Sequence, residues 1–127
     1  GGIIYPELHY GRDALVGIAL FLALLVDKKC KVSELKPQYS EYFMKKIKIT
    51  LEDSNLIDRS FKVIAENYSE LSPNTEDGVR IDFEDAWVHM RKSNTEPIIR
   101  IFAEANSQDI ADSYALKIEK EIKSISA

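Results

Sequence analysis

Apolar and polar positions follow two different periodicities along this chain, and these periodicities divide it into predicted strands and helices. Residues 42–49 and 79–83 alternate between apolar and polar side chains, which predicts half-buried strands. Shorter apolar runs at 87–90 and 98–102 predict two further strands. Two other stretches repeat at helical spacing, with the apolar stripes Ile57, Phe61, Ile64, Tyr68 and Ile110, Tyr114, Ile118, Ile122, Ile125.

Helix-start signals precede both apolar stripes. Asp53 or Ser54 is a predicted N-cap for the first of these helices, and Ser107 is a predicted N-cap for the second. The resulting order of elements is β-α-β-β-β-α. It predicts an α+β domain in which an antiparallel sheet carries its helices on one face.

The first forty residues have a different character. They predict a strand over 2–6, a helix over 13–27 capped by Asp13, and a short helix over 32–35. The segment 14–26 is apolar on every side, but a helix of that length rises only ~20 Å, less than the ~30 Å hydrocarbon core of a membrane. Such a helix should be buried on most sides. We expect it to pack into a sheet whose other strands lie upstream.

A domain boundary is therefore predicted near residue 40. On this interpretation, residues 1–40 are a strand, helix and linker left over from an upstream α/β domain. Residues 41–127 form a self-contained domain of their own.

The loop between the last two predicted strands carries the strongest chemical signal. Ser93, Asn94 and Thr95 offer two hydroxyls, an amide and consecutive backbone N–H groups, while Arg91 and Arg100 offer planar guanidinium groups that match phosphate oxygens. If the strands form a hairpin, both guanidinium groups can reach one anion. The pattern predicts a phosphate site. A polar turn whose side chains bond only to its own backbone is the alternative.

Composition limits the other function classes. The chain has 127 residues, a formal net charge of −4 and a pI near 5.2, which argue against a nucleic-acid or anionic-membrane surface. We also expect no basic, aromatic sheet face of the kind that binds RNA. Asp82, Glu84 and Asp85 are expected to be solvated turn residues rather than metal ligands. A single cysteine, Cys30, excludes an internal disulfide, and without a signal peptide the cytoplasm is the expected compartment.

Two stretches resemble a known enzyme family. Arg-Lys-Ser-Asn-Thr-Glu-Pro at 91–97, followed by a short apolar strand with Arg100, resembles the phosphate-binding loop in the last domain of the α-D-phosphohexomutases. This superfamily includes phosphoglucomutase, phosphomannomutase and phosphoglucosamine mutase. Residues 1–14 resemble the segment that follows the family's sugar-binding loop and leads into the closing helix of its third domain. The resemblance spans nearly the whole chain.

The resemblance implies a fold and an activity. It makes the chain the C-terminal part of a phosphohexomutase, with residues 1–40 ending the third domain and 41–127 forming a TATA-box-binding-protein-like last domain. The family interconverts hexose 1-phosphate and hexose 6-phosphate through a phosphoserine and a bisphosphate intermediate. The substrate phosphate that is not reacting would be held by Arg91, Ser93, Asn94, Thr95 and Arg100.

Other residues receive weaker assignments from the same resemblance. Gly1 and Gly2 would end the sugar-binding loop, and His9 and Arg12 are candidates for lining the cleft between domains. The phosphoserine loop and the aspartate-rich metal loop of the family have no counterpart here. We therefore expect no catalytic residue and no metal ligand in this chain. Mg²⁺ is expected in a full-length parent, and the chain alone should be inactive.

The expected partners are a hexose phosphate and upstream domains of the same polypeptide, without nucleic acid or membrane. Self-association through the helix at 14–26 is a further expectation, because its apolar surface has no partner within the chain. A free-standing phosphosugar-binding module without catalysis is the alternative. The favoured hexose is left open, because that choice depends on residues outside this sequence.

Overall fold

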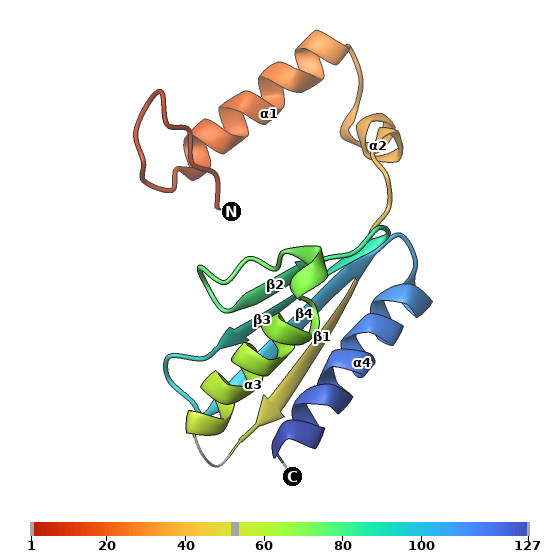
Figure 1. The fold of residues 1–127 in the computed structure, drawn as a ribbon. Coiled ribbons are helices and arrows are strands. Elements are labelled where there is room, and N and C mark those ends of the chain that lie inside the picture. The colour runs from red at the N-terminus through yellow and green to blue at the C-terminus, as the bar shows by residue number, and fades with distance from the viewer. Residues whose placement is uncertain (1, 52–53, 127) are drawn as a thin grey trace. The chain divides into compact units, whose positions relative to one another are not determined.

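The computed structural model describes residues 2–51 and 54–126, and the chain divides into two compact units, Gly1–Ser40 and Glu41–Ala127 (Figure 1). The first unit contains α1 (Ala14–Lys28), α2 (Val32–Leu35) and the 3₁₀ turn η1 (Lys36–Gln38). The second contains β1 (Phe43–Thr50), α3 (Ser54–Asn67), the 3₁₀ turn η2 (Ser69–Leu71), β2 (Val79–Asp82), β3 (Ala86–Lys92), β4 (Ile98–Ala105) and α4 (Gln108–Ser126).

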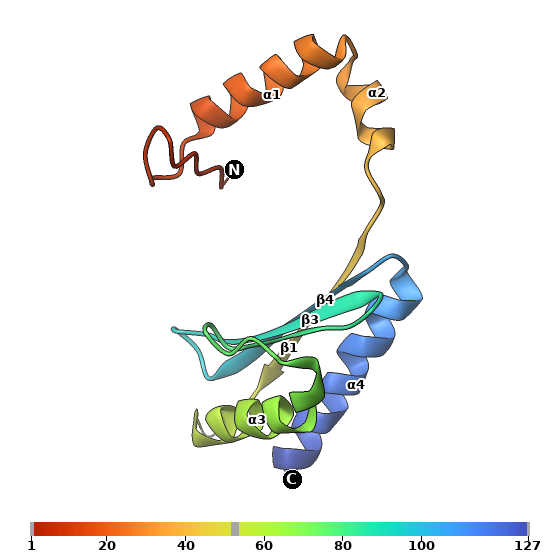
Figure 2. The same cartoon turned by 45° about the horizontal axis from the view of Figure 1, so that its top comes forward.

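The second unit is an antiparallel sheet backed by two helices. Among the described residues, the sheet has four strands in the order β1-β4-β3-β2, and every neighbouring pair runs antiparallel. Figure 2 shows α3 and α4 on the same side of this sheet. The predicted α+β class, the β-α-β-β-β-α order and the placement of both helices on one face are therefore confirmed.

Strand alternation decides which side chains form the core. Every second strand residue is directed at the helices, and these residues are almost fully buried: Val79, Ile81, Val88, Met90, Ile99, Ile101 and Ala103. They pack against Ile57, Ile64, Ala115, Ile118 and Ile122 from α3 and α4. Fully burying one branched aliphatic side chain contributes about 1.5–3 kcal/mol. The intervening residues lie on the sheet face that α3 and α4 leave uncovered, which we call the open face.

The helix starts agree with the predicted caps where the structure describes them. The backbone N–H of Ile110 donates to Ser107 Oγ at 3.3 Å, which confirms the cap of α4. Asp13 Oδ1 accepts from the N–H groups of Leu15 and Val16 at 2.9 and 3.0 Å, which confirms the cap of α1. Asp53 lies outside the described residues, and α3 begins at Ser54.

The predicted strand over 2–6 is wrong. These residues form no strand; Tyr5 pairs with His9 in an isolated bridge instead. A strand needs a neighbouring edge to bond to, and the elements of the first unit in the described residues are all helical. Ile3 packs on α1, since a Cβ added to Gly17 would lie 2.8 Å from Ile3 Cγ1.

Helix α1 keeps its apolar surface exposed. None of its residues is buried, and the side chains of Leu15 and Val26 are 78% and 77% exposed. The described residues of the first unit therefore do not supply the burial expected for this helix. No helix among residues 2–51 and 54–126 combines the length and apolarity needed to cross a membrane.

A glycine-dependent turn leads into β2. Gly78 has φ of 79°, and a Cβ at this position would overlap the carbonyl oxygen of Met90 on the neighbouring strand. Only glycine tolerates both the positive φ and this close approach. The turn therefore brings Asp77 directly beside the end of β3.

Replacing Gly78 with alanine should destabilise the second unit by more than about 2 kcal/mol, because backbone strain and a backbone clash coincide. Urea denaturation followed by fluorescence of the single tryptophan, Trp87, measures this directly. Glu76→Ala in the same exposed turn is the control and should change stability by less than about 0.5 kcal/mol. Equal midpoints for the two variants would contradict the requirement for glycine.

Tyr68 links the end of α3 to α4 and makes the stability of the second unit depend on pH in the alkaline range. Its hydroxyl donates to Glu121 Oε1 at 2.7 Å, and its ring meets Phe83 edge-on at 5.8 Å. Burial and the neighbouring Glu121 carboxylate raise the pKa of Tyr68 above its ordinary value of 10.0. Because the folded pKa is the higher one, the unfolded state loses its proton first. The contribution of Tyr68 is therefore full below pH ~10 and is lost as pH rises above it.

Tyr68→Phe should lower the free energy of unfolding by about 1 kcal/mol at neutral pH through the lost hydrogen bond. It should also flatten part of the fall in stability as pH rises from neutral to above ~10. Denaturation curves across this range test both effects. Tyr42→Phe, at an exposed tyrosine of the same unit, is the matched control and should keep the alkaline slope of the parent. A Tyr68→Phe slope identical to that of this control would count against the linkage.

Candidate functional site: a cationic row beside the Ser-Asn-Thr loop

The two arginines of the predicted site lie directly opposite one another. Strands β3 and β4 form a hairpin in which the Cα of Arg91 pairs with that of Arg100. Their chain neighbours Met90, Ile99 and Ile101 are buried against the helices, so both arginines belong to the open face. Directly opposed residues have Cβ atoms about 5 Å apart, and like charges in that arrangement are destabilising. An anion bound between the two guanidinium groups would remove this repulsion.

A third cation extends the same line. Lys48 of β1 pairs with Arg100 of β4, so Lys48, Arg100 and Arg91 form one row across three strands, which we call the cationic row. Sequence analysis identified the two arginines and missed Lys48. The alternation over 42–49 placed that lysine on the polar side of its strand, but only the strand pairing shows that it lies beside Arg100.

Each end of the cationic row has one carboxylate. Lys48 Nζ lies 3.5 Å from Glu96 Oε2, and Arg91 Nη2 lies 2.8 Å from Asp77 Oδ2. In the part of the chain that the structure describes, the central Arg100 makes no ion pair. The free positive charge is therefore concentrated in the middle of the row.

The loop between β3 and β4 is held by its own polar groups. Ser93 is only 9% exposed, its N–H donates to the carbonyl of Ile98 at 3.0 Å, and its Oγ accepts from the N–H of Thr95 at 3.4 Å. Within the described residues, the backbone N–H groups of Asn94 and Glu96 have no hydrogen-bond partner. The loop thus combines internal order with two backbone donors left for a ligand.

Asp77 is held in place from two sides. His89 Nε2 lies 2.7 Å from the backbone oxygen of Asp77, so Nε2 carries the proton and donates it. The Asp77 carboxylate meets Arg91 on the same face. His89 is half-buried, and its hydrogen bond positions this turn. The contact of this turn with β3 joins residues that are distant in the chain, so no local pattern predicts it.

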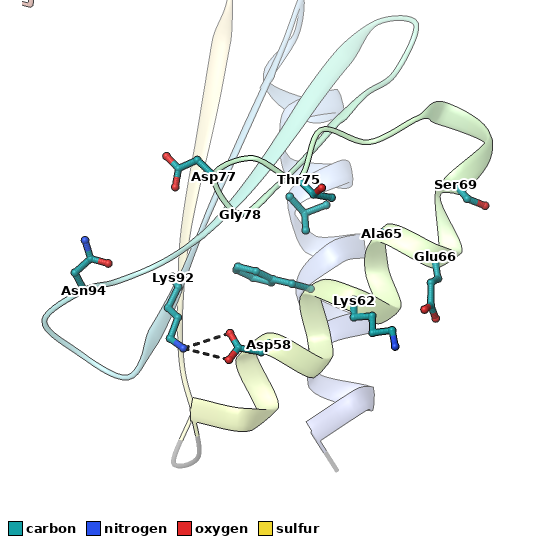
Figure 3. Close-up of a pocket in the computed structure, with 12 residues that line it drawn as sticks. Asp58, Lys62, Ala65, Glu66, Ser69, Thr75, Asp77, Gly78, Lys92 and Asn94 are labelled. Atoms are coloured by element: carbon teal, nitrogen blue, oxygen red, sulfur yellow. Dashed lines mark hydrogen bonds and ion pairs between the residues drawn. The ribbon is translucent and has the colours of Figure 1, made fainter.

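Lys92, the residue after Arg91, belongs to the opposite side of the sheet. Its Nζ lies 3.3 Å from Asp58 Oδ1 on α3, and Figure 3 shows this side chain directed at the helix. A pocket of about 650 Å³ lies there, with an apolar floor that includes Phe61, Ala65 and Val79. Asn94 lines this pocket, whereas Arg91 and Arg100 stand on the open face. Asp77, the partner of Arg91, lines the same pocket, so the pocket extends as far as the turn that contacts Arg91.

The expectation that the sheet lacks a basic, aromatic face is wrong. Trp87, His89 and Phe102 lie on the open face, because they alternate with buried residues along β3 and β4. Arg80 is stacked over Trp87 with its guanidinium carbon 4.7 Å from the ring centre. Carboxylates neutralise much of this charge, however: Arg80 Nη2 lies 2.7 Å from Asp82 Oδ1. The face therefore lacks the continuous positive surface that a polyanion requires.

The weaker site assignments fall in the first unit, apart from Gly1, which lies outside the described residues. Gly2 and Arg12 are exposed. His9 accepts from the N–H of Gly11 through Nδ1 at 3.0 Å, and its Nε2 lies 3.1 Å from Asp13 Oδ2. The hydrogen bond from Val16, followed by that from His9, lowers the pKa of Asp13. His9 thus has a local role at the start of α1.

The described residues do not fit a metal site. No group of three or more His, Cys, Asp or Glu side chains among residues 2–51 and 54–126 is arranged to hold an ion. Two of the three acidic residues considered above have other partners: Asp82 forms an ion pair with Arg80, and Asp85 Oδ1 accepts from the Tyr114 hydroxyl at 3.2 Å. We therefore assign no step of any reaction to a metal bound by these residues.

Comparison with curated proteins finds relatives among sugar-phosphate mutases. The chain is 38% identical over 122 residues to a phosphoglucosamine/phosphogalactosamine mutase of Sulfurisphaera tokodaii, covering 94% of this chain and 27% of that protein. It is 38% identical over 120 residues to a phosphoglucomutase/phosphomannomutase of Thermococcus kodakarensis, covering 90% of this chain and 25% of the relative. The chain thus spans about a quarter of the length of these relatives.

Comparison with solved structures supports the fold. N-acetylphosphoglucosamine mutase of Aspergillus fumigatus, in complex with glucose 1,6-bisphosphate, superposes with a TM-score of 0.61 at 16% identity, covering 94% of this chain and 22% of that one. The same fungal enzyme with GlcNAc-6P and magnesium gives a TM-score of 0.58 at 18% identity, covering 91% and 22%. At such low identity the likeness speaks for the fold alone.

The family model described as phosphoglucomutase/phosphomannomutase, C-terminal domain, matches residues 28–121, which include β1 to β4, α3 and most of α4. The Arg-Lys-Ser-Asn-Thr-Glu-Pro loop and all three cations of the cationic row lie inside this match. The chain therefore belongs to the phosphoglucomutase/phosphomannomutase family, and its residues 28–121 match the C-terminal domain of that family.

Proposed function

We propose that this chain binds the phosphate of a hexose phosphate for a phosphohexomutase that interconverts hexose 1-phosphate and hexose 6-phosphate. The observation that carries the proposal is the like-charged pair Arg91 and Arg100, paired across β3 and β4 next to the Ser-Asn-Thr loop. Two directly opposed guanidinium groups destabilise a sheet, and an anion bound between them offsets this cost. A phosphate has enough oxygens to bond two guanidinium forks at once.

The contribution of this domain is alignment rather than bond-making. In the proposed reaction the phosphate held here is the one that is not reacting, while the other end of the sugar meets a phosphoserine elsewhere in the enzyme. Phosphoryl transfer depends largely on positioning and charge stabilisation, so binding energy at the remote phosphate is used at the reacting end. Ser93, Asn94 and Thr95 would complete the phosphate contacts of the two arginines.

The catalytic parts are proposed to lie outside this chain. The relatives are about four times longer, and among the described residues no group of His, Cys, Asp and Glu side chains is arranged to hold a metal. We propose that Mg²⁺, the phosphoserine and most sugar contacts come from other domains of the same polypeptide, with residues 1–40 ending the preceding domain. This chain alone should then be inactive. The names of the relatives refer to glucosamine, galactosamine, glucose and mannose phosphates, so we propose no single hexose.

The exposed apolar surface of α1 fits the same proposal. Leu15, Ile18, Leu22 and Val26 are each more than half exposed, an arrangement that water disfavours. We propose that upstream elements of the same polypeptide cover this helix in the complete enzyme. Without them, two copies of the chain should bury the surface against each other.

Calorimetric titration of the chain with inorganic phosphate, glucose 1-phosphate and glucose 6-phosphate tests the binding role. Millimolar-order affinity is expected, because most sugar contacts are missing. Arg91→Ala and Arg100→Ala should each weaken binding roughly tenfold or more through lost charge-assisted hydrogen bonds. Arg59→Ala, at an exposed arginine of α3, is the matched control and should bind like the parent. Arg91 and Arg100 variants with parental isotherms would remove both arginines from the site.

Sedimentation velocity tests whether the exposed apolar surface of α1 causes the chain to associate. The chain should associate in a concentration-dependent way, and a double replacement of Leu15 and Val26 by glutamine should shift it towards monomer, because it removes apolar contact area. Replacing the polar, exposed Ser69 and Glu70 of the second unit by glutamine is the control and should leave association unchanged. A monomeric parent at high concentration would overturn this expectation.

A further inference from the structure

We propose that Lys48 is a third phosphate-binding cation, and that Glu96 and Asp77 occupy the two ends of the cationic row until a phosphate displaces them. The inference rests on the proposed function and adds a residue and two competing carboxylates to its site. It predicts that some substitutions near the site tighten phosphate binding, which a simple list of ligating residues would not predict.

The register supplies the first argument. Lys48 faces Arg100 from one side and Arg91 faces Arg100 from the other, so three positive side chains occupy consecutive positions across the sheet. Opposed like charges are unfavourable at both of these contacts. The neighbouring lysine on the same face, Lys46, instead pairs with Phe102, and its Nζ lies 5.9 Å from the centre of that ring. Of the two lysines, only Lys48 is positioned to share an anion with the arginines.

The carboxylates supply the second argument. Both come from loops rather than strands: Glu96 from the β3–β4 loop and Asp77 from the turn before β2. The side chains of Asp77 and Arg91 are 69% and 51% exposed, and those of Glu96 and Lys48 are 51% and 59% exposed. Exposed ion pairs of this kind are weak, so a ligand can displace them at small cost.

The turn geometry fixes the backbone of Asp77 but not its carboxylate. Gly78 and the hydrogen bond from His89 hold the main chain against β3. The carboxylate is directed away from α3 in Figure 3 and contacts Arg91 alone among the cations of the row. It can therefore turn towards solvent without disturbing the strand. The same holds for Glu96, whose side chain extends from an exposed loop.

The net charge of the cationic row predicts whether each substitution weakens or strengthens phosphate binding. The row has the three cations Lys48, Arg100 and Arg91, and the two carboxylates Glu96 and Asp77 reduce their sum to a net charge of +1. A phosphate dianion that displaces both carboxylates meets all three cations. Removing Lys48 should therefore weaken binding, and neutralising either carboxylate should strengthen it.

The first comparison sets Lys48→Gln against Lys46→Gln, titrated with inorganic phosphate and glucose 6-phosphate. Both substitutions remove one positive charge from the same face of β1, so long-range electrostatics changes in a similar way. Lys48→Gln should raise the Kd about threefold to tenfold, and Lys46→Gln less than about twofold. Lys48→Arg should keep the parental affinity, because it retains the charge. The difference in Kd between Lys48→Gln and Lys46→Gln should become smaller at high salt.

The second comparison sets Asp77→Asn against Glu76→Gln. Both remove one negative charge from adjacent positions of the same turn, but only Asp77 contacts Arg91. Asp77→Asn should lower the Kd about twofold to fivefold, the value expected for release of an exposed ion pair. Glu96→Gln should also lower the Kd, because it releases Lys48 from its ion pair. Circular dichroism of each variant checks that the fold is retained.

The outcomes distinguish failure of this inference from failure of the proposed function. If Arg91→Ala weakens binding while Lys48→Gln equals Lys46→Gln and Asp77→Asn equals Glu76→Gln, the inference fails and the proposed function stands. If the parent itself binds neither phosphate nor hexose phosphate at millimolar concentration, the proposed function fails first. Weaker binding by Asp77→Asn would also overturn the inference, since it would make Asp77 a supporting residue rather than a competitor.

Discussion

Antiparallel pairing of β3 with β4 is the constraint on which the rest of this domain depends. The pairing sets Met90 opposite Ile101 on the side of the helices and Arg91 opposite Arg100 on the other side. Because side chains alternate, a slip of one residue would exchange the two faces, burying the arginines and exposing the isoleucines. The large penalty for burying unpaired charge makes that slip unfavourable. The hydrophobic core and the cationic row are thus fixed by one register.

In the proposed function, the cationic row gives an acidic domain a site for an anion. The chain has a net charge of −4, yet three cations meet on the open face near a loop with two unpaired backbone donors among its described residues. Carboxylates from neighbouring loops neutralise the ends of the row. This arrangement limits repulsion in the absence of ligand, and it confines free positive charge to a length that suits a single phosphate better than a polyanion.

Several features were accessible from the sequence because they depend on neighbours in the chain. The stripe of isoleucines in α4, the Ser107 cap and the alternation of β1 all depend on contacts within a few residues, and the structure has them where the pattern predicted. The strand over 2–6 failed for the opposite reason. A strand depends on a partner edge, and residues 2–6 have none in the described part of their unit.

What the sequence determined by itself was the set of elements, the apolar faces and the Arg-Lys-Ser-Asn-Thr-Glu-Pro loop with an arginine on each side, because periodicity and turn chemistry are local. The tertiary structure alone decided that Lys48 joins the two arginines, that Asp77 approaches Arg91, and that Trp87, His89 and Phe102 share the open face. These contacts join residues far apart in the chain through the strand order β1-β4-β3-β2. That order depends on how the whole sheet packs on α3 and α4, so no local pattern in the sequence specifies it.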